Sequence, residues 1–345
     1  MAHPVLDGRA MWNVAELEYP SGATAAEQLR FLLAYAVLAP SPHNSQPWRF
    51  RVRGDEVEVL ADRTRALEML DPEHRELVMS CGAALFHLRV AMRYFGREPI
   101  VAVMPSYEEP DVLAAVKLGP ERDRTVEDEL LFRAIPERHT NRVSMDEAAL
   151  PAALLLSMKD GARLERSWLR SVEQPEQRAA VAELIAQGDR RLYADREYRR
   201  ELVEWMRPND EAACDGVPGY SYGIPELVAP MGVRLVELFN SGRLSGFRDR
   251  RVALNAPALV VLGTAQDCPK SWLAAGQAMG RILLQAAARG VWASYMNQPI
   301  QLPDLRDDLR RTLGLDGFPH LVLRLAHGQP LPHTPRRPVD EVLID

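Results

Sequence analysis

Apolar side chains recur every three or four residues in several stretches of the chain, and this spacing predicts amphipathic helices. The stretches with helical character are residues 24–39, 73–95, 176–206 and 271–290. In the first of them, Thr24 and Glu27 have the spacing of an N-terminal capping box, and Pro40 marks the expected end. Because these helices lie far apart in the chain, other elements must connect them.

Alternating apolar and polar residues predict strands between the helices. The segment WRFRVRGDEVEVLAD, residues 48–62, alternates on both sides of Gly54-Asp55, which predicts a β-hairpin with its turn at that pair. Further strands are expected at residues 100–104, 111–119, 256–264 and 320–328. The Pro-rich tail, residues 331–345, is expected to be extended.

The two halves of the chain share a weak repeat. VEVLADRTR at 57–65 aligns with LVVLGTAQD at 259–267, and VLAAVKLGP aligns with LVLRLAHGQP after a one-residue slip. In the helices that follow the first pair, Gly82 and Gly96 are 14 residues apart, as are Gly276 and Gly290. The shared order indicates an internal duplication. The alternative is that strand–helix–strand units resemble one another by chance.

Charge and cysteine content exclude several classes of protein. There are 42 basic and 48 acidic side chains, so the net charge is −6, which argues against a nucleic-acid protein. The three cysteines share no CxxC spacing, so we expect neither a disulfide framework nor a metal site. The sequence has no secretory signal pattern and no run of 18 apolar residues, so we expect a cytoplasmic protein outside the membrane.

Two polar stretches carry candidate chemistry. In PSPHNSQPW, residues 40–48, hydroxyl and amide groups lie between prolines and could donate to phosphate or ribose oxygens. In RHTNR, residues 138–142, two arginines flank an imidazole and a hydroxyl, and arginine is the usual fork for phosphate. The alternatives are a simple connecting turn for the first and a solvated surface for the second. Arg336-Arg337 in the tail could likewise bind phosphate or lie on a solvated surface.

Common catalytic signatures are missing from the sequence. It contains no GxSxG, no HExxH, and no GxGxxG after a strand. No side chain has the surroundings of an activated nucleophile. If the protein is an enzyme, a bound cofactor is therefore expected to supply the chemistry. A long Gly- and Pro-rich stretch, residues 207–232, is a candidate lid over such a site.

Taken together, these motifs resemble those of nitroreductase-like flavoproteins. APSPHNSQPW followed by WRFRV is similar to that family's flavin loop, and RHTNR resembles its R-[RH]-[ST] run. ARGVWASYMNQPI looks like the segment that runs along the flavin ring, and PRRP looks like the basic C-terminal arm. The usual order of loop and basic run is reversed here. That order resembles the Acg-like branch of the superfamily, in which a fused pseudo-dimer keeps one FMN site.

The resemblance implies an α+β fold, with mixed, mainly antiparallel sheets flanked by helices and two degenerate halves that form an intramolecular pseudo-dimer. We expect an N-terminal extension at 1–24, a first half at 25–130, and a second half at 131–345 intertwined with the first. A monomer would then suffice, although a homodimer stays open.

The resemblance also implies a set of FMN-binding positions. Contacts to the phosphate and ribitol are expected from Arg138, His139, Thr140, Arg142, Arg336 and Arg337. From the other half, the expected contacts are Pro40, Ser41, Pro42, Asn44 and Gln46. Tyr295, Met296 and Asn297 are expected beside the isoalloxazine, with a backbone N–H near Asn297 donating to flavin N5. Arg251 is a candidate for the pyrimidine edge.

The implied activity is an FMN-dependent oxidoreductase with no catalytic side chain and no metal. NAD(P)H would reduce the flavin, and a nitroaromatic, quinone or other conjugated small molecule would accept the electrons. The alternative is a protein that stores or sequesters FMN beneath the 207–232 stretch with little or no turnover.

Overall fold

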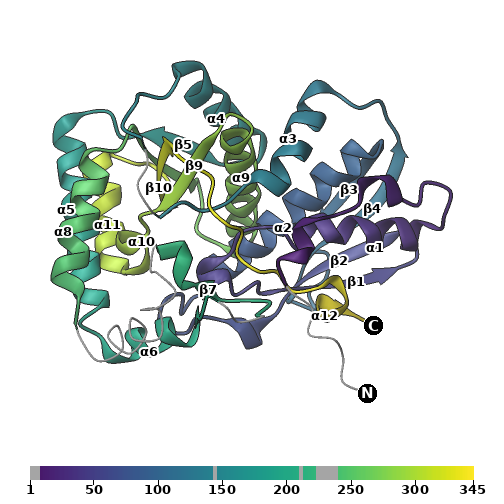
Figure 1. Cartoon of the computed structure of the whole chain (residues 1–345), viewed down its shortest axis with the longest axis horizontal. Helices are drawn as coiled ribbons and strands as arrows, with labels where there is room; N and C mark the ends of the chain where they lie inside the picture. The colour runs from purple at the N-terminus through teal and green to yellow at the C-terminus, as the bar shows by residue number, and fades with distance from the viewer. Residues whose placement is uncertain (1–7, 143–145, 210–212, 223–239) are drawn as a thin grey trace.

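Two β-sheets lie on either side of a central pair of helices in the computed structural model, which describes residues 8–142, 146–209, 213–222 and 240–345 (Figure 1). The first sheet has the order β11-β1-β2-β4-β3, formed by Leu343–Ile344, Trp48–Arg53, Glu56–Ala61, Val112–Glu121 and Arg97–Val103. The second has the order β5-β8-β10-β9, formed by Trp168–Ser171, Ala258–Thr264, Phe318–His327 and Val291–Tyr295. A short parallel pair joins β6 (Met206–Arg207) to β7 (Val217–Pro218).

The first sheet buries one face. β1 and β2 form the predicted hairpin, paired antiparallel from Trp48↔Ala61 to Arg53↔Glu56. Phe50 and Val59 are fully buried in the core beneath the helices, whereas Arg51 on the other face pairs with Glu58 across the hairpin. This alternation follows from the two-residue period of a strand.

The second sheet is buried on both faces. Val260 and Leu262 of β8 belong to the core on the side of the central helices. The residues between them, Leu259 and Val261, belong to a second core formed with the outer helices α5 (Pro175–Leu192) and α11 (Pro303–Leu313). Helices on both sides explain why β8 is an unbroken apolar run rather than an alternating one.

The central helices α2 (Arg75–Tyr94) and α9 (Pro269–Ala287) touch through glycine. An added Cβ on Gly82 would lie 2.3 Å from the carbonyl oxygen of Leu273, and one on Gly276 would lie 2.0 Å from that of Met79. The two contacts are related by the same offset of 194 residues. Each glycine therefore plays the same part in one helix that its counterpart plays in the other.

Most predicted elements are present with shifted ends. Helix α1 (Ala25–Ala36) begins with the predicted capping box at Thr24 and Glu27. The prediction of one helix over 176–206 was wrong, because α5 ends at Leu192 and α6 (Arg196–Glu204) begins after the N-cap Asp195. Helices that the pattern did not predict are α3 (Val126–Glu137), α4 (Ala152–Leu164), α8 (Gly242–Leu254), α10 (Gln298–Gln301) and α11 (Pro303–Leu313).

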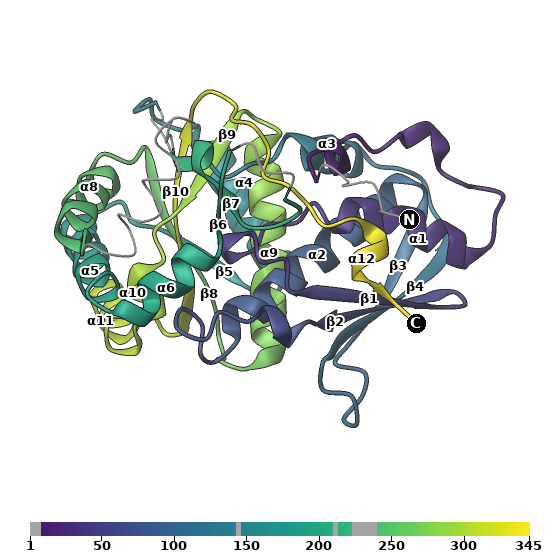
Figure 2. The same ribbon diagram turned by 60° about the horizontal axis from the view of Figure 1, so that its bottom comes forward.

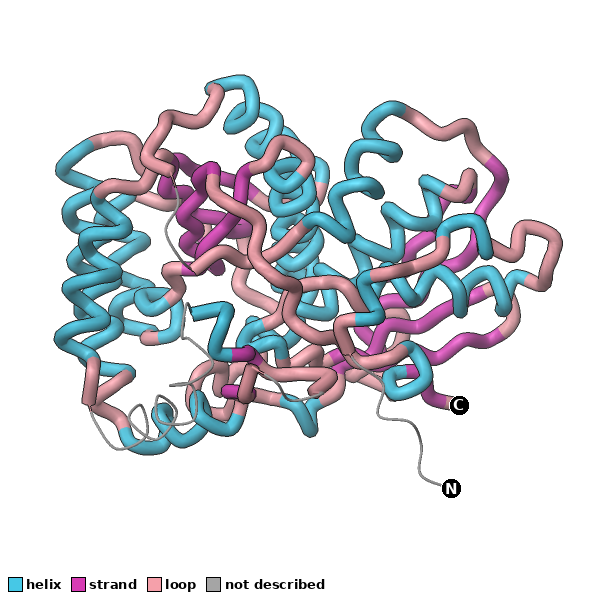
Figure 3. Tube along the Cα trace, in the orientation of Figure 1, coloured by secondary structure: helices cyan, strands magenta, loops and turns pink. Residues whose placement is uncertain are grey.

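The C-terminal arm runs from the second sheet back to the first (Figure 2). After β10 the chain is extended as predicted, and it then forms the short helix α12 (Val339–Val342) and strand β11. β11 pairs parallel with β1, with Phe50 opposite Leu343. The trace shows this arm and the loops around it crossing between the two groups of elements (Figure 3). The first sheet is thus completed by residues of the expected second half.

Candidate functional site

Two adjoining cavities lie between the sheets. The large one has a volume of about 560 Å³, and its wall combines the 40–48 loop with α2, α5, α8 and β9. The small one lies beneath the C-terminal arm and has a volume of about 30 Å³. Ser41, Thr140 and Arg142 line both cavities, so the two adjoin at these residues. The volume of the large cavity is in the range of ordinary ligand pockets.

The 40–48 loop has an unusual backbone. His43, Asn44 and Gln46 have φ values of 48°, 54° and 50°, a region that residues other than glycine rarely adopt. The Ser41 hydroxyl accepts a hydrogen bond from the Gln46 amide at 2.9 Å and holds the turn closed. Such conformations persist only where the surroundings enforce them, and they cluster at functional sites. The loop places Ser41 and His43 in the wall of the large cavity.

Asn44 holds three segments together at the small cavity. Its Nδ2 donates to the carbonyl oxygens of Gly216 and Pro335, both at 2.9 Å. Its Oδ1 accepts from Arg336 at 2.8 Å. The loop, the 213–217 segment and the C-terminal arm therefore meet at this one amide.

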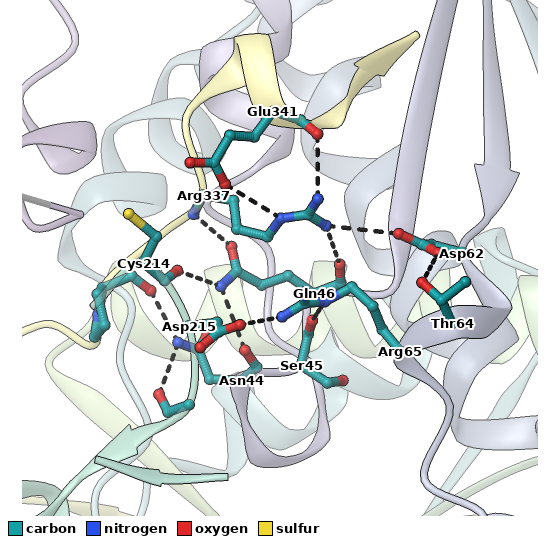
Figure 4. A network of polar contacts seen from close by, with 12 residues as sticks. Asn44, Ser45, Gln46, Asp62, Thr64, Arg65, Cys214, Asp215, Arg337 and Glu341 are labelled. Carbon is teal, nitrogen blue, oxygen red and sulfur yellow. Dashed lines mark hydrogen bonds and ion pairs between the residues drawn. The ribbon is translucent and has the colours of Figure 1, made fainter. Parts of the chain in front are cut away.

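Gln46 ties the same three segments from the other side (Figure 4). Its Nε2 donates to the Cys214 carbonyl and its Oε1 accepts from the Arg337 amide, both at 2.8 Å. The Arg337 side chain turns toward Asp62 and Glu341. Neither Gln46 nor Arg337 lines either cavity. The structure thus places these two expected FMN contacts behind the cavity wall, where they position other residues.

A network of ion pairs fixes the 213–217 segment. No sequence motif predicts it. Asp215 pairs with Arg65 (Figure 4). It also pairs with Arg207 at 2.8 Å. The two guanidiniums also lie against the Trp205 ring, 5.1 and 6.0 Å from its centroid. Because both arginines bind it, the pKa of Asp215 is lowered despite its burial. Of the expected lid at 207–232, residues 210–212 and 223–232 lie outside the described ranges.

The 138–142 run lies along the edge of the second sheet. Thr140 forms a parallel bridge with Ala293 of β9, and the Asn141 amide donates to the Ala293 carbonyl at 3.0 Å. This docking places Arg138 in the wall of the small cavity and Arg142 in the wall of both. The structure therefore brings the basic run of the second half against the loop of the first, as the resemblance implied.

Two buried arginines dominate the electrostatics of the small cavity. Arg138 and Arg336 are 4% and 2% exposed, and within the described ranges no carboxylate pairs with either guanidinium. Burial lowers the pKa of Arg138 to about 10, and burial followed by repulsion from Arg138 lowers the pKa of Arg336. Uncompensated buried charges destabilise a fold unless an anion neutralises them. The cavity therefore fits a phosphate group.

Two hydrogen bonds and a ring contact hold His139 in place. Its Nδ1 donates to the Glu137 carbonyl at 3.1 Å, and its Nε2 accepts from the Leu331 amide at 3.1 Å. The ring lies 4.0 Å from the Trp292 ring, centroid to centroid. Burial lowers the pKa of His139, so the imidazole is neutral. His139 lines the small cavity and also fastens the C-terminal arm to the 138–142 run.

The end of β9 forms one wall of the large cavity. Tyr295, Met296 and Asn297 all line it, as expected for the segment beside the isoalloxazine. The Asn297 side chain is fixed because its Oδ1 accepts from the Val322 amide at 3.0 Å and its Nδ2 donates to Glu76 at 3.3 Å. The backbone at Asn297 is therefore held rigidly against the cavity.

Buried carboxyl groups in the large cavity were missed by the sequence reasoning. Burial raises the pKa of Glu76 to about 7, and burial together with the charge of Asp249 raises the pKa of Asp189 to about 7. The Asp189 Oδ2 and the Gln298 Oε1 accept no hydrogen bond from any residue that the structure describes. These acceptors lie on helices whose contact with the cavity depends on tertiary packing, and no local motif marks them.

Arg251, the expected pyrimidine-edge residue, lies on the exposed face of α8 and lines a separate groove. In the described ranges, no three His, Cys, Asp or Glu side chains gather as metal ligands would. None of the helices that the structure describes has the length and apolar character needed to cross a bilayer.

The chain is similar in sequence to proteins of one known family. The model of the nitroreductase family matches residues 166–329. "Putative NAD(P)H nitroreductase Rv3131" of Mycobacterium tuberculosis is 33% identical over 323 residues, covering 92% of this chain and 91% of its own. The protein of that organism named acg is 28% identical and covers 94% and 97%. The chain therefore belongs to the nitroreductase family.

Among solved structures, an FMN and NADPH-dependent nitroreductase, NfnB of Sphigopyxis sp. strain HMH, is 21% identical with a TM-score of 0.42. That match covers 62% of this chain and 97% of NfnB.

Proposed function

We propose that the protein is an FMN-dependent NAD(P)H oxidoreductase of the nitroreductase type that reduces a nitroaromatic, quinone or other conjugated small molecule. The observation that carries this proposal is the pair Arg138 and Arg336, which lie buried in the small cavity with no carboxylate of the described residues paired to either. The names of the relatives, among them NAD(P)H nitroreductases, support it.

The residues present fit FMN. Arg138 and Arg336 would hold its phosphate, Thr140 and Ser41 line the passage between the cavities where the ribitol would lie, and Tyr295 lies beside the space for the ring. When bound, FMN supplies a site that accepts a hydride from a reduced nicotinamide and passes electrons to an acceptor. The chain itself would orient these partners and exclude water, since no side chain has to form a bond with substrate.

One observation favours the alternative of FMN storage. Val217 and Ser221 line the small cavity, and the segment that carries them is fixed by Asn44 and by the Asp215 ion pairs. A phosphate held there would be enclosed by side chains from three segments. Slow release of the cofactor follows from such enclosure, and this would suit a protein that holds FMN with or without turnover.

We also propose that the two halves form an intramolecular pseudo-dimer. The support is the reciprocal contact between Gly82 and Gly276, because a two-fold interface repeats each contact with the partners exchanged. The proposed division lies near residue 130, which falls within α3.

An anaerobic visible spectrum of the purified protein tests the proposed function. We expect a flavin spectrum that bleaches within seconds of adding NADPH or NADH and returns when a quinone is added. A flavin that only dithionite bleaches would favour storage, and a colourless protein that cannot be reconstituted with FMN would contradict both functions.

The same preparation tests the phosphate site. The double variant Arg138→Ala, Arg336→Ala should lose at least about a hundredfold in FMN affinity, since each charge-assisted contact to phosphate contributes about 1.5–3 kcal/mol. Arg163→Ala is the control, because Arg163 is exposed and pairs with Asp160 on its own helix. Unchanged FMN affinity in the double variant would contradict the site assignment.

A further inference from the structure

A second groove adjoins the large cavity on the side of α8. Its volume is about 310 Å³, and it shares Arg248, Val252 and Arg324 with the large cavity. The groove and the large cavity therefore adjoin at these three residues. Nothing in the proposed flavin site uses this groove.

Arg324 lines both spaces, and none of the described residues forms a hydrogen bond or ion pair with its side chain. It lies on β10 opposite Ser294 of β9, and the residue is 8% exposed. Its Nε has no hydrogen bond, and no residue in the described ranges forms an ion pair with it. Burial lowers the pKa of Arg324, although Glu147 and Asp249 act against this. A buried guanidinium with free donors that faces a groove requires an anionic ligand.

The carboxylate of Asp249 near Arg324 is already engaged. It accepts hydrogen bonds from Arg248 at 2.8 Å and from the Gln298 amide at 3.1 Å. Glu147 lines the groove and reaches Arg324 only through longer-range attraction. The positive charge at the junction therefore stays available for a ligand.

The outer part of the groove adds a second cation and an aromatic ring. Arg251 is exposed and forms no ion pair with the described residues, whereas its neighbour Arg250 pairs with Glu183 at 3.3 Å. Phe247, one turn earlier on α8, lines the same groove and is 69% exposed. A free arginine beside an exposed ring matches the needs of a purine nucleotide, which offers a phosphate and a flat base.

We propose that this groove binds the phosphorylated adenosine end of the reduced pyridine nucleotide, with Arg324 and Arg251 on a phosphate and Phe247 against the adenine. This proposal rests on the proposed function, because the nicotinamide end would then lie in the large cavity. The phosphate is either the 2′-phosphate of NADPH or the pyrophosphate common to both nucleotides.

Stopped-flow reduction of the FMN-loaded protein at increasing NADPH and NADH tests the proposal. In Arg251→Ala the apparent Kd for NADPH should rise about tenfold or more, with the limiting rate of flavin reduction unchanged, because the lost contact acts on binding alone. Arg250→Ala, on the same helix, should change the Kd less than twofold. Glu147→Gln should lower the Kd, because it removes a negative charge from the groove.

The two nucleotides distinguish the source of the phosphate. A loss confined to NADPH assigns the groove to the 2′-phosphate, and an equal loss for NADH assigns it to the pyrophosphate. An unchanged Kd for both nucleotides in Arg251→Ala and in Arg324→Met would overturn the proposal. A loss of affinity for electron acceptors that carry a carboxylate, with no loss for either nucleotide, would also overturn the proposal.

Calorimetric binding of adenosine 2′,5′-bisphosphate and of 5′-AMP separates this proposal from the proposed function. Neither ligand carries electrons, so their binding does not depend on turnover. If neither nucleotide reduces the flavin but adenosine 2′,5′-bisphosphate binds and Arg251→Ala weakens it, the groove assignment stands and the oxidoreductase does not. If both nucleotides reduce the flavin and neither probe binds, the groove assignment fails alone.

Discussion

Asp189 shows how a single buried carboxyl group links the cavity to stability. It is 2% exposed, its Oδ1 accepts from Gln298 at 3.1 Å, and the Asp249 carboxylate binds the same amide. Burial next to a second carboxylate raises the pKa of Asp189 to about 7. The folded protein thus keeps a proton on Asp189 that the unfolded chain loses near pH 4.

We therefore expect Asp189→Asn to stabilise the protein at high pH. Where the native state binds more protons than the unfolded state, the free energy of unfolding falls as pH rises. The stability associated with protonated Asp189 is complete below about pH 4 and is lost as pH rises through about 7. In urea unfolding, the variant should gain about 1–3 kcal/mol over the native protein between pH 5 and pH 8.

Glu183→Gln on the same helix is the matched control, because Glu183 is only partly buried and pairs with Arg190 and Arg250. Its difference from the native protein should vary little over this range. If the stability difference between Asp189→Asn and the native protein also stays constant with pH, the assigned protonation of Asp189 is contradicted.

The sequence motifs predicted which segments meet better than which side chains line the cavities. The loop at 40–48 and the run at 138–142 lie against the same cavities, because each is a contiguous motif whose composition is informative by itself. The burial of Gln46 behind the wall depends on the 213–217 segment, some 170 residues away, and no local pattern reports such a partner. Arg324 and Asp189 lie within ordinary strand and helix sequences, so only tertiary packing reveals their roles.

At the scale of elements, the contact between α2 and α9 gives a sharp prediction. Gly82→Ala and Gly276→Ala should each destabilise the protein, by about 1–3 kcal/mol or more, since the new methyl group would overlap a backbone carbonyl of the other helix. Thermal unfolding should report similar losses for the two variants. Gly22→Ala, where an added Cβ meets nothing within 4 Å, should be neutral. Equal midpoints for all three variants would show that the helices do not approach as described.

Helices with a periodic apolar face were predicted only in part, because α11 buries Leu305, Leu309 and Leu313 on one face and was not expected. Helix α8 buries only Gly242, Gly246 and Ala253, because it lies close against α5. Such a helix leaves no apolar stripe in the sequence. The prediction of a single long helix at 176–206 was wrong because Asp195 caps a new helix. Its side chain accepts hydrogen bonds from the Glu197 and Tyr198 amides, and the spacing of apolar residues gives no sign of such a cap.

At the scale of the molecule, the reciprocal helix contact predicts a monomer. Each central helix already covers the other within one chain, so the face that a dimer of separate halves would use is occupied. Light scattering coupled to gel filtration should give a molar mass near 38.7 kDa at micromolar concentration. A mass near twice that value, unchanged on dilution, would contradict the prediction. The general architecture of paired sheets and helices was predictable from the sequence motifs, whereas the route of the C-terminal arm was not.

That arm has a consequence for the order of events during protein synthesis. Residues 336–344 are translated long after residues 48–142, yet they supply an edge strand to the first sheet and a guanidinium to the small cavity. While the chain is still emerging from the ribosome, the first sheet has an open edge beside β1 and the cavity lacks Arg336. With Arg336 as the proposed phosphate contact, cofactor capture would be a late event, and FMN availability would act on finished chains rather than on nascent ones.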